Sequence, residues 1–130
     1  MPTSRPTDAQ LSILNVLWRI GSSTVRQVHE ALPDEVRRGY TTTLKLMQIM
    51  AEKGLVLRDE SERSHVYTAA AEEHELKDLL VDDLMIKAFG GSSAALAMRA
   101  LAQRPSSQAE LDAVRQLLDR LESSSEEESR

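Results

Sequence analysis

The residues of this sequence best suited to chemistry form one cluster between positions 41 and 48. They share helical spacing, and they are Thr41, Thr42, Leu44, Lys45 and Gln48. A glutamine can form two hydrogen bonds with an adenine, a lysine favours guanine, and a leucine can contact a thymine methyl group. Threonine hydroxyls suit phosphates, although Thr41 and Thr42 can equally serve as a helix cap. The cluster predicts a helix that reads DNA; the alternative for Lys45 and Gln48 is an ordinary solvated face.

Two arginines lie where they can support such a helix. Arg26 falls in the first turn of the preceding helical stretch, from which it can reach the DNA backbone beside the groove. Arg63 falls at the tip of a predicted hairpin, the place from which a wing touches phosphate or minor groove. An arginine there can also be simply solvated, and Asp59, Glu60 and Glu62 beside it weaken the electrostatic attraction.

Catalytic and metal-binding patterns are missing from the sequence. It contains no Gly-rich phosphate loop, no G-x-S-x-G, no H-E-x-x-H and no cysteine. His29, His65 and His74 lack a ligand-type spacing such as i, i+4. We therefore predict no enzyme activity, no catalytic residue, no metal site and no cofactor.

A helix followed at once by a hairpin must position the cluster. Apolar residues recur at Leu46, Met47 and Met50, one turn after Thr43, and Lys53-Gly54 is typical of a helix end. Two β-prone runs, 55–58 and 65–68, then flank the polar stretch 59–64, which predicts a hairpin. This order is that of the second half of a winged helix-turn-helix.

The residues before the cluster supply the first half of that fold. Thr7-x-x-Gln10 and Thr24-x-x-Gln27 are capping-box patterns, which predict a helix from Asp8 to Ile20 and a second over TVRQVHEAL. Residues 21–23 are predicted to form the turn between them, and Trp18 is expected in the core. We therefore predict a winged-helix DNA-binding domain at 1–71 in a mainly α chain with a small β-hairpin wing.

Residues 72–122 are predicted to form a helical dimerisation domain. Helical patterns are interrupted at Gly90-Gly91-Ser92-Ser93 and at Pro105-Ser106-Ser107, and the last helix shows a narrow 3-4-3 apolar seam. This apolar surface can thicken one core, but it exceeds what a small winged helix needs, which favours a two-fold homodimer. The predicted dimer residues are Leu76, Leu80, Leu84, Leu111, Val114, Leu118 and Leu121. Residues 123–130 are predicted to be a disordered acidic tail.

Charge by itself does not indicate DNA. The formal net charge is −5. Residues 1–71 hold 9 Lys+Arg and 8 Asp+Glu, a balance of +1, so the acidity lies in the C-terminal half. A winged-helix protein-interaction module that does not read DNA is therefore the alternative function. No apolar run approaches ~18 residues and no signal peptide is visible, so we expect a cytoplasmic protein without membrane insertion.

The sequence resembles the penicillinase and methicillin-resistance repressor family (BlaI/MecI type) from about residue 7 to 122. The resemblance rests on DAQLSILNVLW, TVRQVHEAL, YTTTLKLMQIMAEKGLV, HVYTA, FGGSSAALAMRAL and ELDAVRQLLDRLE, in this order. It implies a winged helix with a helical dimerisation domain, acting as a homodimer that represses transcription from a palindromic operator. It also implies a regulatory protease, because a membrane-bound zinc metalloprotease sensor of β-lactams leads to cleavage of well-known members.

The sequence departs from the family pattern at two points, Ile49 and Arg99-Ala100. Ile49 stands where many relatives have an arginine, and Arg99-Ala100 stands where the resistance repressors are cut at Asn-Phe. Copper-responsive relatives use C-terminal cysteines, and this chain has no cysteine. Since no residue pattern predicts a ligand pocket either, we expect regulation from outside, by a protease or by disruption of the dimer.

Overall fold

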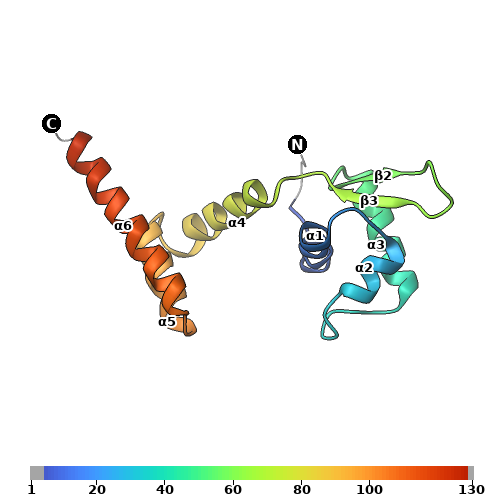
Figure 1. Cartoon of the computed structure of the whole chain (residues 1–130), viewed down its shortest axis with the longest axis horizontal. Coiled ribbons are helices and arrows are strands. Elements are labelled where there is room, and N and C mark those ends of the chain that lie inside the picture. The colour runs from blue at the N-terminus through green and yellow to red at the C-terminus, as the bar shows by residue number, and fades with distance from the viewer. Residues whose placement is uncertain (1–4, 129–130) are drawn as a thin grey trace. The chain divides into compact units, whose positions relative to one another are not determined.

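The computed structural model describes residues 5–128, with side chains through residue 125. It consists of two compact units that divide between Leu80 and Val81 (Figure 1). This division lies further along the chain than the boundary that the sequence predicted after residue 71. The fold class is confirmed, because helices dominate and the first unit carries a small antiparallel sheet.

Helix α1 spans Asp8–Ile20, the range predicted. The Thr7 hydroxyl accepts the Gln10 N–H at 3.2 Å, and Gln10 Oε1 accepts the Thr7 N–H at 2.9 Å, which completes the capping box. The helix ends at Gly21, which has a φ of +84° and donates its N–H to Leu17 O. A side chain would be strained in that conformation, so glycine suits the position.

Helix α2 spans Val25–Ala31 and begins with the second predicted capping box. It ends before Pro33, because a proline forces the preceding residue out of the helical region, and Leu32 has a ψ of 141°. Arg37 closes this end by donating from Nη2 to Leu32 O at 2.6 Å and from Nε to His29 O at 3.0 Å. The loop that leads to the next helix is thereby anchored to the end of α2.

A three-stranded antiparallel sheet follows the order β1-β3-β2. β2 (Val56–Asp59) and β3 (Val66–Ala69) form the predicted hairpin, and Figure 1 shows it extending beside the helices. The third strand, β1 (Ser23–Thr24), corrects the prediction of a simple turn at 21–23. Two residues are too short for a strand pattern, and their pairing with Val66 and Tyr67 comes from far along the chain.

The core of the first unit lies where α1, α2, the sheet and α3 (Tyr40–Glu52) pack together. Its fully buried side chains include Leu14, Val28, Met47, Met50, Leu55 and Tyr67. Trp18 packs against this core, half-buried, and donates from Nε1 to Ala71 O at 3.1 Å. The expectation that Trp18 is a core residue rather than a base-stacking one is consistent with this contact.

Helix α4 (Glu73–Ala88) begins on this core, and this corrects one predicted dimer contact. Leu76 is only 3% exposed within a single chain and belongs to the core cluster, so its side chain is not available to a second subunit. Leu80, one turn later, is half-buried against the same cluster. The first turns of α4 therefore belong structurally to the winged-helix unit.

The second unit contains the rest of α4, α5 (Ser93–Gln103) and α6 (Gln108–Glu128). The predicted break between the first two occurs at Gly90 and Gly91, whose φ values are +58° and +82°. A capping box that sequence inspection missed starts α6, because Ser107 Oγ accepts the Glu110 N–H and Glu110 Oε1 accepts the Ser107 N–H.

The predicted disordered tail at 123–130 is also corrected. Helix α6 continues through Glu128, and residues 129–130 lie outside the described residues. Glutamate has a high intrinsic helix propensity, which favours a helical conformation at residues 126–128. Among residues 5–128, no helix combines the length and the apolar character that a membrane span requires.

Candidate nucleic-acid interface

The exposed face of α3 carries most of the predicted base-reading residues. Thr43, Met47 and Met50 point into the core, and this orientation leaves the opposite side of the helix in solvent. The side chains of Thr41, Thr42, Lys45 and Gln48 are exposed, and that of Leu44 is half-buried. The helix thus presents a polar surface with one apolar side chain at its centre.

The N-terminus of α3 decides between the two roles considered for its threonines. The N-cap residue is Gly39, and no side chain caps this end. Thr41 and Thr42 therefore lie inside the first turn, so the helix-cap role is excluded. Their hydroxyls remain exposed beside a helix start that no side chain caps, an arrangement that suits a phosphate oxygen.

A polar cavity of about 470 Å³ lies where α3, the hairpin and the start of α2 meet. Four predicted residues line it together, namely Arg26, Leu44, Gln48 and Arg63. Thr42 lines a different cavity, on the other side of α3, and Thr41 and Lys45 line neither. The structure thus gathers the two predicted arginines from separate elements beside the polar face of α3.

The side chain of Arg26 is oriented by the first residue of α3. Its Cζ atom lies 5.1 Å from the centre of the Tyr40 ring, a cation–π distance. The edge of the His29 ring contacts the same tyrosine at 5.7 Å between ring centres, and His29 Nδ1 lies 2.8 Å from the Thr43 hydroxyl. This series of contacts fixes the start of α2 against the start of α3.

Arg58 also lines the polar cavity, and sequence inspection did not single it out. It lies on β2 opposite Tyr67 of β3. A hydrogen bond to the Tyr67 side chain is the main cause that raises the pKa of Arg58, and Glu60 adds an ion pair at 2.7 Å. One arginine in a short strand carries no spacing signal, so only the strand register could have revealed it.

The acidic residues of the hairpin are partly engaged within the hairpin itself. Asp59 Oδ1 accepts the Ser61 N–H at 2.9 Å, and this bond lowers the pKa of the Asp59 carboxyl. Glu60 pairs with Arg58, whereas Arg63 has no ion-pair partner among the side chains described, those of residues 5–125. Two of the three carboxylates that counted against DNA binding, Asp59 and Glu60, are therefore engaged with groups other than Arg63.

The second unit carries a different kind of surface. None of the described residues from 81 to 125 is buried. Of the predicted dimer residues, Leu84, Leu118 and Leu121 are about half exposed, at 48%, 50% and 57%, and Leu111 and Val114 are half-buried. Further exposed apolar side chains, not predicted, are Val81, Ile86, Met98, Leu101 and Leu117. This unit lacks a core of its own in a single chain.

Three possible metal ligands meet at the start of α4. The ligand atoms of Glu72, His74 and Glu75 lie within 4.8 Å of one another. All three side chains are exposed, and His74 Nδ1 already lies 3.5 Å from a Glu72 oxygen. Exposed acidic groups gather in this way without an ion, and we assign no metal to them.

Comparison with known proteins gives three similarities. The family model described as penicillinase repressor matches residues 6–120. A protein of Mycobacterium tuberculosis named transcriptional regulator BlaI is 34% identical over 120 residues, which cover 92% of this chain and 86% of the relative; it occurs in two strains. A solution structure of the DNA-binding domain of the repressor BlaI is 24% identical, covers 55% of this chain and 85% of its own, and has a TM-score of 0.47.

Proposed function

The chain belongs to the penicillinase repressor family, and from that premise we propose that it represses transcription by binding a palindromic operator as a homodimer. In this proposal the protein is cytoplasmic, its partner is double-stranded operator DNA, and it catalyses no reaction. The observation that carries the proposal is the polar cavity beside α3. There Arg26, Arg58 and Arg63, from three different elements, surround the exposed face of one helix.

In this proposal α3 enters the major groove, whose base edges distinguish all four base pairs. Lys45 and Gln48 read bases, and Leu44 contacts a thymine methyl group. Thr41, Thr42 and Arg26 bind phosphates, and Arg63 binds phosphate or minor groove from the hairpin tip. Exposure supports these roles, because each of these side chains except Leu44 is exposed.

Arg58 extends this set of contacts. The family resemblance implies an arginine at position 49, where this chain has a half-buried isoleucine, Ile49. Arg58 lines the same cavity as Gln48, one helical position before Ile49. We propose that Arg58 supplies from the strand part of the positive charge that Ile49 does not supply from the helix.

The second unit provides the dimer contact. Several apolar side chains are about half exposed in one chain. Covering them with a second copy stabilises the dimer by roughly 25 cal/mol for each Å² of apolar surface removed from water. A two-fold dimer places two winged-helix units (residues 5–80, the reading head of each chain) on one DNA. This symmetry is the reason for a palindromic operator. Leu84, Leu118 and Leu121 are proposed as its central contacts.

Release from DNA is proposed to follow from cleavage within residues 90–101 by a regulatory protease. A cut there separates α6 from the reading head and so removes much of the dimer contact. Arg99 and Ala100 are exposed but lie inside α5, whereas Gly90 and Gly91 form the turn before it. Proteases act on accessible, flexible chain, which favours the turn. Mass spectrometry of the protein from induced cells identifies the cut, and a chain that stays intact under every inducing condition contradicts this step.

A gel shift with the DNA upstream of its own gene tests the main proposal. The matched control is a scrambled fragment of equal length and composition. With about three or four phosphate contacts per subunit, the log–log salt dependence of the binding constant should have a slope of roughly −5 to −7. A slope near zero, with equal binding to both fragments, would favour the protein-interaction module, which the near-neutral first half of the chain permits.

A further inference from the structure

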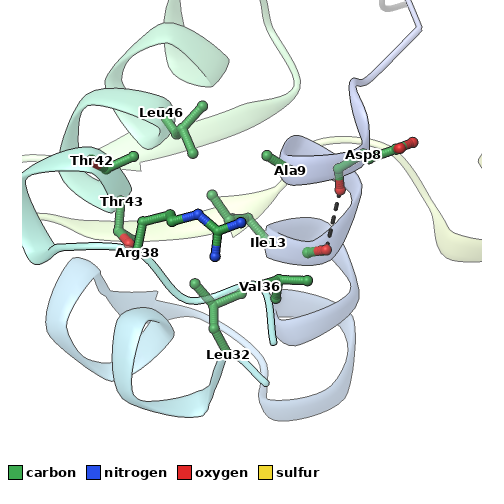
Figure 2. Close-up of a pocket in the computed structure, with 10 residues that line it drawn as sticks. Asp8, Ala9, Ile13, Leu32, Val36, Arg38, Thr42, Thr43 and Leu46 are labelled. Atoms are coloured by element: carbon green, nitrogen blue, oxygen red, sulfur yellow. Dashed lines mark hydrogen bonds between the residues drawn. The ribbon is translucent and has the colours of Figure 1, made fainter. Parts of the chain in front are cut away.

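A second cavity of the reading head lies on the side of α3 away from the polar cavity. It has a volume of about 430 Å³, within the range of small-molecule sites, and opens between α1, the loop before α3 and α3 itself (Figure 2). Ile13 and Leu32 form its buried base, and Val36 and Leu46 flank it. Its lining is mainly apolar, in contrast to that of the polar cavity.

Arg38 is the cation of this cavity. Figure 2 shows its side chain extending between α3 and α1, toward Ile13. It donates two long hydrogen bonds, 3.4 Å each, from Nη1 to the backbone oxygens of Glu35 and Arg37. The neighbouring Arg37 is in contrast fully engaged, with Asp34 and with three backbone oxygens. Arg38 therefore keeps donors for a ligand.

An anion is favoured as the partner of Arg38 because no carboxylate among the described side chains pairs with it. The Asp8 carboxylate points away from the cavity, and the Asp8 backbone oxygen accepts the Ser12 hydroxyl at 3.1 Å along α1 (Figure 2). No acidic side chain of residues 5–125 forms an ion pair with Arg38. The exposed Thr42 hydroxyl adds a neutral hydrogen-bond donor on the α3 side.

We propose that this cavity binds a small carboxylate with an apolar body, roughly six to ten carbons long to suit a cavity of this size. The apolar body lies on Ile13, Leu32 and Leu46. The carboxylate accepts hydrogen bonds from Arg38, which is suited to paired contacts with a planar carboxylate. No local residue pattern predicted this pocket, because its lining residues come from three separate segments of the chain.

Occupation of the cavity would weaken operator binding, a consequence that rests on the proposed function. Thr42 lines the cavity and is also a proposed phosphate contact. A carboxylate beside it brings a negative charge close to the DNA backbone, which repels it. Because coupling between two sites is reciprocal, bound operator DNA must lower the affinity for the carboxylate by the same factor.

The binding step is tested without DNA, by following the backbone amide and methyl NMR signals of the full chain during titration with octanoate. Octanol is the matched control, since it carries the same apolar chain without the charge. We expect saturable shifts at Ile13, Leu46 and Thr42, and about tenfold weaker binding of octanol, since hydrogen bonds to charged groups carry a difference of this order. Shifts confined to the second unit, or equal binding of octanol and octanoate, would overturn the proposal.

Two variants and one control variant make the test specific to this cavity. Arg38→Gln should reduce octanoate binding to the level of octanol, whereas Arg104→Gln, an exposed arginine of the second unit, should not change it. Ala9→Leu adds bulk at a position that faces the cavity in Figure 2 and should weaken both ligands. Unchanged octanoate binding in both Arg38→Gln and Ala9→Leu would exclude the site.

The regulatory step is measured separately as the effect of octanoate on the operator dissociation constant of each variant. Saturating octanoate should raise this constant about fivefold or more in the wild type, the lower range of allosteric coupling, and not in Arg38→Gln. If the wild type does not bind the operator even without octanoate, this would instead count against the proposed function, and the NMR result would stand by itself. Saturable NMR shifts with no change in operator affinity would overturn the coupling.

Discussion

The guanidinium of Arg26 lies over the ring of Tyr40, with 5.1 Å between Cζ and the ring centre. Arg26 belongs to the first turn of α2, and Tyr40 is the first residue of α3. Without the ring, an exposed arginine would sample many rotamers, and fixing it would cost entropy at the moment of binding. The contact with Tyr40 therefore orients Arg26 for the proposed hydrogen bond to a DNA phosphate before DNA binds.

Replacement of Tyr40 tests this preparation. Tyr40→Ala should weaken operator binding by about 0.5–1 kcal/mol, the range of an exposed cation–π contact. Tyr40→Phe keeps the ring and should bind like the wild type. Fluorescence anisotropy with labelled operator measures both, and circular dichroism checks that the fold is retained. Equal affinity of the alanine and phenylalanine variants would show that the ring does not orient Arg26.

We expect α3 to read bases and the hairpin tip to bind phosphate, so variants of the two should have different effects. Lys45→Ala and Gln48→Ala should each weaken operator binding by roughly 1–3 kcal/mol and relax the sequence preference at one position. Arg63→Ala should weaken operator and scrambled DNA alike and make the salt slope shallower by about 1. Competition gel shifts with single-base operator variants measure the difference. If both α3 variants keep full specificity, the reading residues lie elsewhere.

The dimer contact is tested at the exposed seam of α6. Leu118→Glu places a charge on a surface that is proposed to be covered, which is costly without a partner. The variant should sediment as a monomer and lose about 10²–10⁴ in operator affinity, since one head then binds without the effective concentration of the second. Leu118→Met keeps the apolar contact and is the control. A wild type that is monomeric at micromolar concentration would contradict the dimer.

The capping box of α6 predicts a pH dependence. The Ser107 N–H bond lowers the pKa of the Glu110 carboxyl, so the ionised form stabilises the helix start. This stabilisation is present above the pKa of the unfolded chain and is lost as the pH falls through the lower pKa of the folded chain. The cap should therefore weaken toward acid.

Glu110→Gln removes this titration while keeping the cap, because Gln10 and Gln27 accept the same kind of bond in the other two boxes. Thermal melts followed by circular dichroism from about pH 7 to about pH 3 compare the two proteins, a range that spans an ordinary glutamate pKa. The stability of the wild type relative to the variant should fall at the acidic end. A constant difference across the range would show that Glu110 contributes no titrating cap.

Local contacts explain why much of the reading head could be predicted. Each predicted capping box joins residues three positions apart, so its letters carry the whole signal, and the bounds of α1 are confirmed. The hairpin likewise depends on two β-prone runs with a short polar connection, and both strands are confirmed. Thr43 was expected on the inner face of α3 from spacing alone, and it is buried there.

The missed features depend on partners that lie far apart in the chain. β1 exists because residues 23 and 24 pair with residues 66 and 67, and Leu76 is buried because α4 begins on a core built by α1 and the sheet. Arg58 joins the candidate site only through its register with Tyr67. No local pattern could predict these pairings, because a strand or helix face shows only that it must be covered and not by which segment.

The amino-acid sequence thus determined by itself the starts of α1 and α2, the hairpin and the face of α3 that meets solvent, because these follow from hydrogen bonds and side-chain periodicity within a few residues. Only the tertiary structure decided which cations surround α3, which leucines remain uncovered, and that Arg38 lies beside an apolar cavity. These properties arise when segments separated along the chain pack together, and packing is a property of the whole fold.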